Sequence, residues 1–436
     1  MKKLILLLFM LYFIYDISYC QNISIQDKEE YLKIDDCYFL AEKNYPLIKN
    51  LQLMNKSVEY NISNAAKNYL PQISLSAQAS YQSDVTEFPN EMKSLYEKLG
   101  INMHALNKDQ YRVLLELYQN IWDGGIIKST KYQSFTEGEV EKASLNIELY
   151  SIRKKINDLY FGILLLDSRL KQNLVQQNVL YVNLNKVNSL INNGVAMLPD
   201  ANILNAELLT LKQQYIVLES THKAYKAMLK IFIGRDVDKL CLPSYENINV
   251  SQINRPELDY MSKLEQNYVA SERLVKSQLY PKIGVQIQGI YGYPGLNLFK
   301  DMTDNSLKLN YIASINLKWN IGAFYTKKNK LNNIKLAKAM VENKRETFLF
   351  NTKLSTLAID SELDRLKKCM EYDDNIIKLR ESVRQSYESK LQNGIINIAD
   401  LVRELSLETN ARITKSIHHI EIIKNIYDLK FTTNNY

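Results

Sequence analysis

One uninterrupted helical pattern, from Ile126 to Asn192, constrains this chain more than any other feature. The stretch contains no proline, and its glycines are Gly138 and Gly162. Its apolar residues recur at alternating spacings of four and three, the period of a coiled-coil seam: Leu145, Leu149, Ile152, Ile156, Leu159, Ile163, Leu166 and Leu170. At 1.5 Å per residue the helix would be roughly 100 Å long. It cannot bury its own apolar stripe, so the chain must supply partner helices of similar length.

The first 20 residues have the features of a secretory signal peptide. Lys2 and Lys3 precede the apolar run Leu4–Ile14, and the small residues Ser18 and Cys20 precede Gln21. We expect simple cleavage after Cys20. Lipidation of Cys20 is the alternative, but lipoprotein signals place a small residue before the cysteine, and Tyr19 is large.

Charge and cysteine content limit the classes of protein to which the chain could belong. A net charge of +7 over 436 residues indicates a solvated surface rather than a nucleic-acid patch. The mature chain would keep Cys37, Cys241 and Cys369, an odd number without metal-site spacing. Isolated, partly buried thiols are expected. A Cys37–Cys241 disulfide remains the alternative in an oxidising compartment.

Two pairs of prolines indicate an internal duplication. Pro46 and Pro71 are 25 residues apart, and so are Pro256 and Pro281. The first pair lies in a helical pattern that runs from Lys28 to Leu70. A second helical pattern follows Pro256. Each half then reads helix, strand, strand, long helix, turn, helix, which predicts repeats at 21–245 and 246–436, after a signal peptide at 1–20.

After each second proline the apolar period changes from that of a helix to that of a strand. Apolar and polar residues alternate over about 72–83, 110–121, 282–292 and 310–321, so each predicted strand has one apolar and one polar face. Tyr111, Val113, Leu115, Leu117 and Ile121 share the apolar face of the second strand. The segments Ser83–Gln110 and Gly292–Asn310 are predicted to be long polar loops without an aromatic cluster.

Long helices follow each pair of strands, at about 126–192 and 199–233 in the first half and at about 324–392 and 397–430 in the second. The turns between them are Asn193-Gly194-Val195 and Asn393-Gly394-Ile395. An aspartate stands six residues after each glycine: Asp200 and Asp400. A carboxylate in the first turn of a helix offsets the positive end of the helix dipole.

The strands have the length and alternation of transmembrane β-strands. Interfacial aromatic residues are expected near their ends: Tyr81, Tyr111, Trp122, Tyr291, Tyr311 and Trp319. An open sheet edge is not tolerated in lipid, and four strands are too few to enclose a channel, so several copies must share one barrel. A soluble hairpin domain with coiled-coil arms is the alternative that alternation alone leaves open.

The duplicated proline-plus-strand units, the Trp-x-x-Gly strand exits and the paired Gly194/Asp200 and Gly394/Asp400 turns resemble the TolC-type outer-membrane efflux proteins. This resemblance implies a mainly α fold with a membrane part: a homotrimer with a 12-stranded β-barrel and a periplasmic α-helical barrel. It implies a passive exit duct, served by a periplasmic adaptor and an inner-membrane efflux pump or ABC exporter. Asp200 and Asp400 would line the periplasmic aperture, and the glycine turns would dock the adaptor.

One departure from the family concerns the latch. Some members place a tyrosine before the second glycine and an arginine after it, where this chain has Leu391 and Ile396, so the latch chemistry does not transfer. Within the barrel, Val113 and Ile315 should face lipid, and Ser76 and Asn316 the lumen.

The sequence lacks the motifs of enzymes. No nucleophile elbow, phosphate loop or metal-binding helix motif occurs, and the histidines are His104, His222, His418 and His419. We therefore expect no catalytic, cofactor or metal site. A periplasmic coiled-coil scaffold without a pore and an outer-membrane receptor or adhesin are the other functional interpretations. The cargo and the class of pump are not encoded in any motif.

Overall fold

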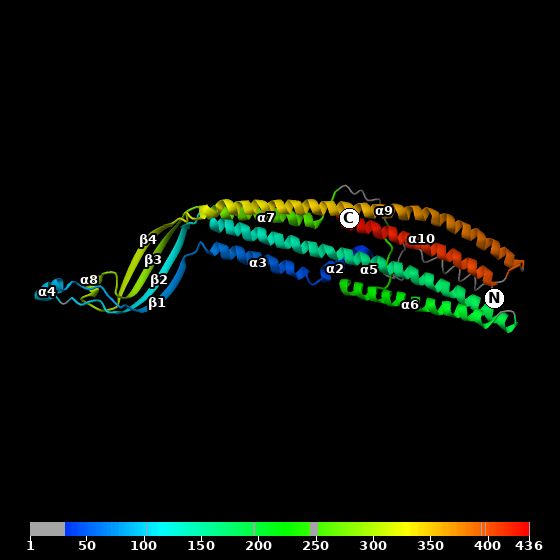
Figure 1. Ribbon diagram of the computed structural model, residues 1–436, viewed down its shortest axis with the longest axis horizontal. Coiled ribbons are helices and arrows are strands. Elements are labelled where there is room, and N and C mark those ends of the chain that lie inside the picture. Colours follow the sequence, from blue (N-terminus) through cyan, green and yellow to red (C-terminus); the bar gives the residue numbers. More distant parts are fainter. Residues whose placement is uncertain are drawn as a thin grey trace, which may run out of the picture. The chain divides into compact units, whose positions relative to one another are not determined.

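The computed structural model describes residues 31–101, 103–194, 197–244, 252–393, 395–396 and 398–435. The predicted signal peptide, Val195 and Gly394 lie outside the described residues. The elements follow one another in this order (Figure 1): α2 (Ile34–Asn44), α3 (Ile48–Lys67), β1 (Gln72–Tyr81), α4 (Asn90–Lys98), β2 (Asp109–Trp122), α5 (Ile126–Asn192), α6 (Leu198–Ile233), α7 (Pro256–Ser277), β3 (Lys282–Tyr293), α8 (Leu298–Asp301), β4 (Lys308–Lys318), α9 (Ala323–Gln392) and α10 (Ile398–Thr433).

The chain forms two compact units, and each draws on both halves of the sequence. The sheet unit comprises Leu51–Ala143 and Tyr260–Lys344. The helical unit comprises the described residues of three segments, 31–50, 144–259 and 345–435. The two predicted repeats are therefore interleaved in space, and the division at residue 245 stays a prediction about the sequence.

The single helical pattern predicted from Lys28 to Leu70 is wrong, because the chain breaks near Pro46. α2 ends at Asn44, and Tyr45 is extended, with φ −69° and ψ 125°. A proline disfavours helical geometry in the residue before it, which explains the break. The Asn44 side-chain amide donates to the carbonyl oxygens of Ile231 and Phe232 at 3.1 and 3.2 Å. The break therefore anchors α2 to the end of α6.

The core of the helical unit lies where α2, α5, α6 and α10 meet. The buried cluster includes Ile156, Phe161, Leu229 and Ile423. At its edge the Tyr160 hydroxyl donates to the carbonyl oxygens of Leu32, at 2.8 Å, and of Cys241. These contacts close the core with a buried hydroxyl whose hydrogen-bonding capacity is satisfied.

Cys37 and Cys241 are buried free thiols, so the alternative of a disulfide between them is wrong. Burial raises the pKa of the Cys37 thiol to about 12. A thiol held neutral in this way is a poor nucleophile. Cys369 is also a free thiol.

Long helical hairpins form the rest of the helical unit: α5 runs beside α6, and α9 beside α10 (Figure 1). A second apolar cluster joins α9 and α10 through Leu363, Leu366, Ile422 and Ile426. Within the described residues, no helix is both long enough and apolar enough to cross a membrane.

In the sheet unit, β1, β2, β3 and β4 form one antiparallel sheet in chain order (Figure 1). Pro71 and Pro281 stand directly before β1 and β3, where a missing backbone donor removes no interior ladder bond. β1 and β4 are the two edges of this sheet.

The loops between the strands contain secondary structure and buried apolar side chains, whereas their polar composition predicted neither. They contain α4 and α8, and Leu106, Tyr293 and Met302 form a buried apolar cluster between them. Phe88 stacks with Phe299 and packs against Tyr96, with ring centroids 5.8 and 5.6 Å apart. The prediction that these loops lack an aromatic cluster is therefore wrong. Its members come from two loops that are distant in sequence.

Candidate functional site: a two-faced sheet and two helical turns

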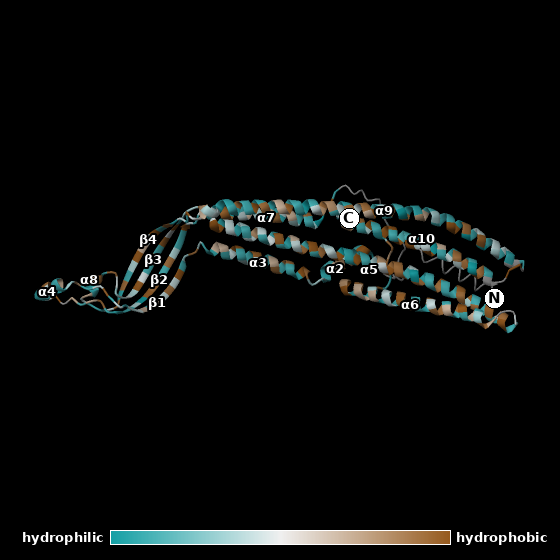
Figure 2. Cartoon of the chain, in the orientation of Figure 1, coloured by the Kyte–Doolittle hydropathy of each residue, from teal (hydrophilic) through white to brown (hydrophobic). Residues whose placement is uncertain are grey.

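The register of the sheet gathers the apolar residues of all four strands on one face. Residues directly opposite each other in antiparallel strands share a face. Leu75 lies opposite Leu115, Val113 opposite Tyr291, and Val285 opposite Ile315. Figure 2 shows the resulting alternation of apolar and polar residues along each strand. We call this side the apolar face. It is exposed in the chain, with Leu75 at 71% and Ile315 at 78%.

The predicted interfacial aromatics form two bands on the apolar face. Tyr81, Tyr111, Tyr291 and Tyr311 lie near the strand ends that lead into the loops, whereas Trp122 ends β2 and Trp319 follows β4 on the side of the long helices. From Tyr111 to Trp122 the strand covers roughly 36 Å, or about 28 Å along an axis tilted by 40°. That height matches the apolar band of an outer-membrane barrel.

A β-bulge corrects one part of the predicted face. Asn120 lies opposite Gly284, but the next pair is Trp122 with Ile283, so Ile121 has no partner. Strict alternation predicted Ile121 on the apolar face. Because of the extra residue, Trp122 takes that place in the register instead. The Trp122 ring packs edge-on against Tyr280, with centroids 6.3 Å apart.

The opposite face of the sheet, which we call the polar face, has hydrogen bonds between its side chains. Gln288 donates to Glu116 at 2.9 Å, and Asn316 donates to Gln286 at 2.5 Å. Gly284 leaves room for the Tyr118 ring, because a Cβ at residue 284 would lie 2.6 Å from the Tyr118 hydroxyl oxygen. Ser76 also belongs to this face, opposite Leu114.

The two glycine turns close the helical hairpins. Gly194 has φ +74°, which favours glycine, and its amide donates to the Ile191 carbonyl at 2.9 Å. In the second turn the Asn393 amide donates to Ser389 at 3.1 Å, and the Ile395 amide to Lys390 at 2.9 Å. Ile395 is 70% exposed. These turns offer small, accessible surfaces at the ends of the hairpins.

Both aspartates stand in the first turn of a returning helix, as their position after the glycines predicts. The Asp200 carboxylate accepts the Met197 amide at 3.0 Å, a capping interaction. The Asp400 carboxylate lies 3.7 Å from the Lys186 ammonium group of α5. Sequence reasoning missed Lys186, because nothing local marks it as the partner of a residue in another hairpin.

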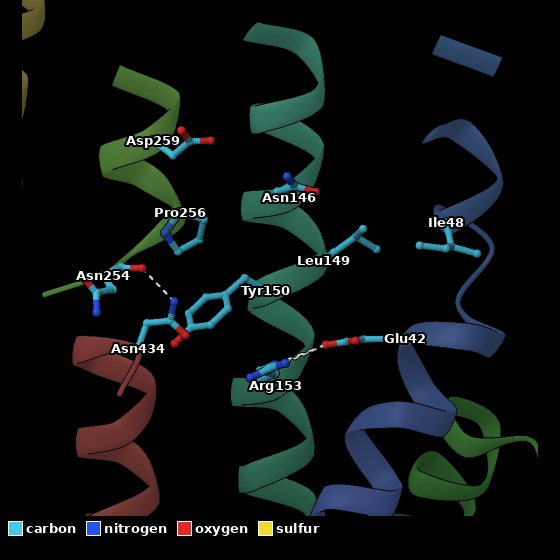
Figure 3. A pocket seen from close by; sticks show the side chains of 10 residues that line it. All are labelled: Glu42, Ile48, Asn146, Leu149, Tyr150, Arg153, Asn254, Pro256, Asp259 and Asn434. Atoms are coloured by element: carbon cyan, nitrogen blue, oxygen red, sulfur yellow. Dashed lines mark hydrogen bonds and ion pairs between the residues drawn. The ribbon is translucent and has the colours of Figure 1, made fainter. Parts of the chain in front are cut away.

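A shallow cavity of about 390 Å³ lies in the helical unit (Figure 3). α5 contributes Asn146, Leu149, Tyr150 and Arg153, and the remaining lining residues are Glu42, Ile48, Asn254, Pro256, Asp259 and Asn434. Arg153 is paired with Glu42 at 3.1 Å, and the Asn434 side chain donates to the Asn254 carbonyl at 2.7 Å. The charged residues that line the cavity are Glu42, Asp259 and Arg153. The Arg153 guanidinium is already paired with Glu42.

None of the described histidines lies in a strand: His104 is in a loop of the sheet unit, and the others are in the helical unit. His104 is exposed in a loop, His222 lies 2.9 Å from Asp167, and His418 lies 2.5 Å from the nearly buried Asp373. Among the residues that the structure describes, no group of three or more His, Cys, Asp or Glu side chains is placed to hold a metal ion.

Comparison with solved structures confirms the predicted arrangement of helices and strands within one chain. The outer membrane protein VceC from Vibrio cholerae aligns with a TM-score of 0.66 at 12% identity, over 92% of this chain and 96% of that one. The Neisseria gonorrhoeae MtrE outer membrane channel in its open state gives 0.65 and 13%, over 96% and 95%. The Campylobacter jejuni CmeC outer membrane channel gives 0.64 and 13%, over 96% and 90%. No family model and no curated protein sequence matches the chain.

The matched structures are channels of the TolC type, and the likeness extends over nearly all of both chains. At this level of identity the comparison concerns the fold. The resemblance drawn from the duplicated motifs is thereby confirmed for the arrangement of helices and strands.

Proposed function

We propose that this protein is the outer-membrane exit duct of a tripartite efflux or type I secretion system. It would work as a passive channel without catalytic activity of its own. An inner-membrane efflux pump or ABC exporter would supply the energy, and a periplasmic adaptor would join pump and duct. The observation that carries the proposal is the apolar face of the sheet, bounded by tyrosines at one end and tryptophans at the other.

The sheet edges support a shared barrel. β1 and β4 are the edge strands, and the strands alternate in direction. β4 of one copy can therefore pair antiparallel with β1 of the next, as a closed membrane barrel requires. Three copies would give 12 strands, with the apolar face toward lipid and the polar face toward the lumen.

The helical turns belong to the same proposal. Asn193-Gly194-Val195 and Asn393-Gly394-Ile395 would meet the adaptor, and Asp200 and Asp400 would line the periplasmic aperture. The capping role of Asp200 and the ammonium group beside Asp400 offset part of the charge that such a ring would carry.

Substitutions on the two faces test the barrel. An arginine near the middle of a lipid-facing strand costs about 2–4 kcal/mol, whereas lumen positions tolerate charge. Ile315→Arg, midway between Tyr311 and Trp319, should lower the yield of folded trimer extracted from outer membranes, as measured by native gel and size-exclusion chromatography. Val113→Arg is closer to the tyrosine band and should lower the yield less. Ser76→Arg is the matched control on the polar face.

If all three variants assemble equally well, the apolar face does not contact lipid. The competing scaffold without a pore also predicts release of the protein by alkali, whereas the barrel predicts retention in the membrane fraction.

A further inference from the structure

The junction between strands and long helices in the sheet unit is strongly basic. The junction comprises residues 64–70, 120–133, 271–283 and 317–330, and its acidic residues are Asp123 and Glu272. Its basic residues are Lys67, Lys128, Lys131, Arg273, Lys276, Lys282, Lys318, Lys327, Lys328 and Lys330. Much of the excess positive charge of the chain is therefore gathered where the strands begin and end.

The two acidic residues do not neutralise this junction. Asp123 is only 4% exposed, and its carboxylate accepts the amides of Gly125 and Ile127 at 2.9 and 2.6 Å. Glu272 is paired with Lys276 at 2.7 Å and with Lys338 at 3.1 Å. Most of the lysines of the junction consequently keep an uncompensated charge.

Two of these lysines face each other across the sheet. Lys282, the first residue of β3, lies directly opposite Lys318, the last residue of β4. Their neighbours Ile283 and Leu317 belong to the apolar face, so both lysines belong to the polar face. Directly opposed side chains in antiparallel strands have Cβ atoms about 5 Å apart, and like charges in this arrangement destabilise a sheet.

The carboxylate nearest this pair in register is already engaged by the backbone: Asp123 follows Trp122, the partner of Ile283, and accepts the amides of Gly125 and Ile127. Among the described residues neither lysine has an ion-pair partner, and the next row of the polar face is Asn120, Gly284 and Asn316. Toward the middle of the strands, the first carboxylate of that face is Glu116, which is bonded to Gln288. At about 3.3 Å per residue it is roughly 20 Å from the lysine pair, beyond the screening length of about 8 Å at physiological salt.

We propose that Lys282 and Lys318 form an anion-binding ring at the helix end of the barrel lumen, which makes the duct selective for anionic cargo. This inference rests on the proposed function, since assembly around a threefold axis turns one pair from every copy into a continuous ring. An anion in the lumen removes the repulsion between the two ammonium groups. Carboxylates, phosphates and sulfates are the cargo chemistry that the ring favours.

Single-channel recording under asymmetric KCl tests the ring. Because the carboxylates proposed at the periplasmic aperture also contribute to the wild-type reversal potential, the measured quantity is the shift that the variants cause. Lys282→Gln/Lys318→Gln should shift this potential toward the cation side, because Gln keeps the length and polarity of the side chain and loses the charge. Lys367→Gln/Lys368→Gln is the matched control: both lysines are exposed in α9, outside the sheet unit, and should leave the potential unchanged.

A thermal unfolding measurement separates the ring from the channel. At constant ionic strength, replacing chloride by sulfate should raise the melting temperature of the wild-type protein more than that of Lys282→Gln/Lys318→Gln. In chloride alone the double variant should melt at the higher temperature, because the repulsion is gone.

The outcomes distinguish the two proposals. A protein that forms no channels but shows the sulfate effect overturns the proposed function and leaves the anion site intact. A conducting wild type whose reversal potential is the same as that of Lys282→Gln/Lys318→Gln overturns the anion ring.

Discussion

The two helical hairpins have the same outline but are held together differently. Between α5 and α6 the contacts near the turn are apolar, with Ala201, Leu208 and Leu211 buried on α6. Between α9 and α10 ion pairs take their place. Arg380 meets Glu404 at 3.6 Å, and Arg384 meets Glu408 at 2.7 Å. Further pairs join Arg412 to Glu381 and Lys415 to Asp374. A histidine–aspartate pair is common to both hairpins: His222 with Asp167 and His418 with Asp373.

This difference shows that a duplicated pattern of long helices does not require a duplicated means of packing. An apolar seam loses stability in proportion to the area and volume removed. A seam of partly buried charges depends on each partner, because a carboxylate left alone in a poorly hydrated place is costly. Glu408 is shared by Arg384 and Arg412, and Arg384 also contacts Glu388, so the charged seam offers alternative pairings of similar geometry.

The largest effect is expected from Arg384→Met. The side chains of Arg384 and Glu408 are 11% and 10% exposed, so the substitution leaves a nearly buried carboxylate with Arg412 alone. We expect the free energy of local opening of α10, measured by hydrogen exchange, to fall by about 3 kcal/mol.

The matched control is the double variant Arg384→Met/Glu408→Met, which removes both charges and should recover most of the loss. Equal losses in the single and double variants would mean that packing, rather than pairing, holds this part of the hairpin.

A smaller loss is expected from Leu211→Ala in the apolar seam. Leu211 is 8% exposed, and its carbonyl accepts the Asn173 side chain at 3.1 Å, a bond that the substitution keeps. Truncation should lower the opening free energy of α6 by about 2 kcal/mol. Raising the salt concentration should leave this loss unchanged, because no charge is involved. The exposed neighbour Lys212 provides the control, and Lys212→Ala should have little effect.

The smallest effect concerns pH and α10. Burial, with a further contribution from Lys415, lowers the pKa of His419 below its usual 6.5. The unfolded chain therefore takes up a proton more readily than the folded chain. The contribution of His419 to the free energy of unfolding is therefore fully present above pH 6.5. It decreases as the pH falls below that value.

The corresponding measurement is the opening free energy of α10 between pH 7 and 5, corrected for intrinsic exchange rates. His419→Gln should make the dependence shallower. If the variant and the wild type lose stability in parallel, the sensitivity to acid comes from other groups of the charged seam.

The secondary structure of this protein, and the faces of its strands, follow largely from local features of the sequence: the period of its apolar residues and the positions of its glycines and prolines. Alternation around Val113 and Ile315 determined which side chains share a face, because the strand period is two. The uninterrupted heptads from Ile126 determined the length of α5, and the glycine at 194 determined where its hairpin turns. These features depend on residues that are neighbours in the chain.

Other features depend on which distant residues come to lie opposite each other, and the tertiary structure decided them. The bulge that places Trp122, rather than Ile121, on the apolar face results from the pairing of β2 with β3. Lys186 meets Asp400, and Lys282 meets Lys318, only because separate segments are aligned at those positions. The period of a sequence determines the face on which a side chain lies. The free energy of a charged side chain depends on the group that the tertiary structure places beside it.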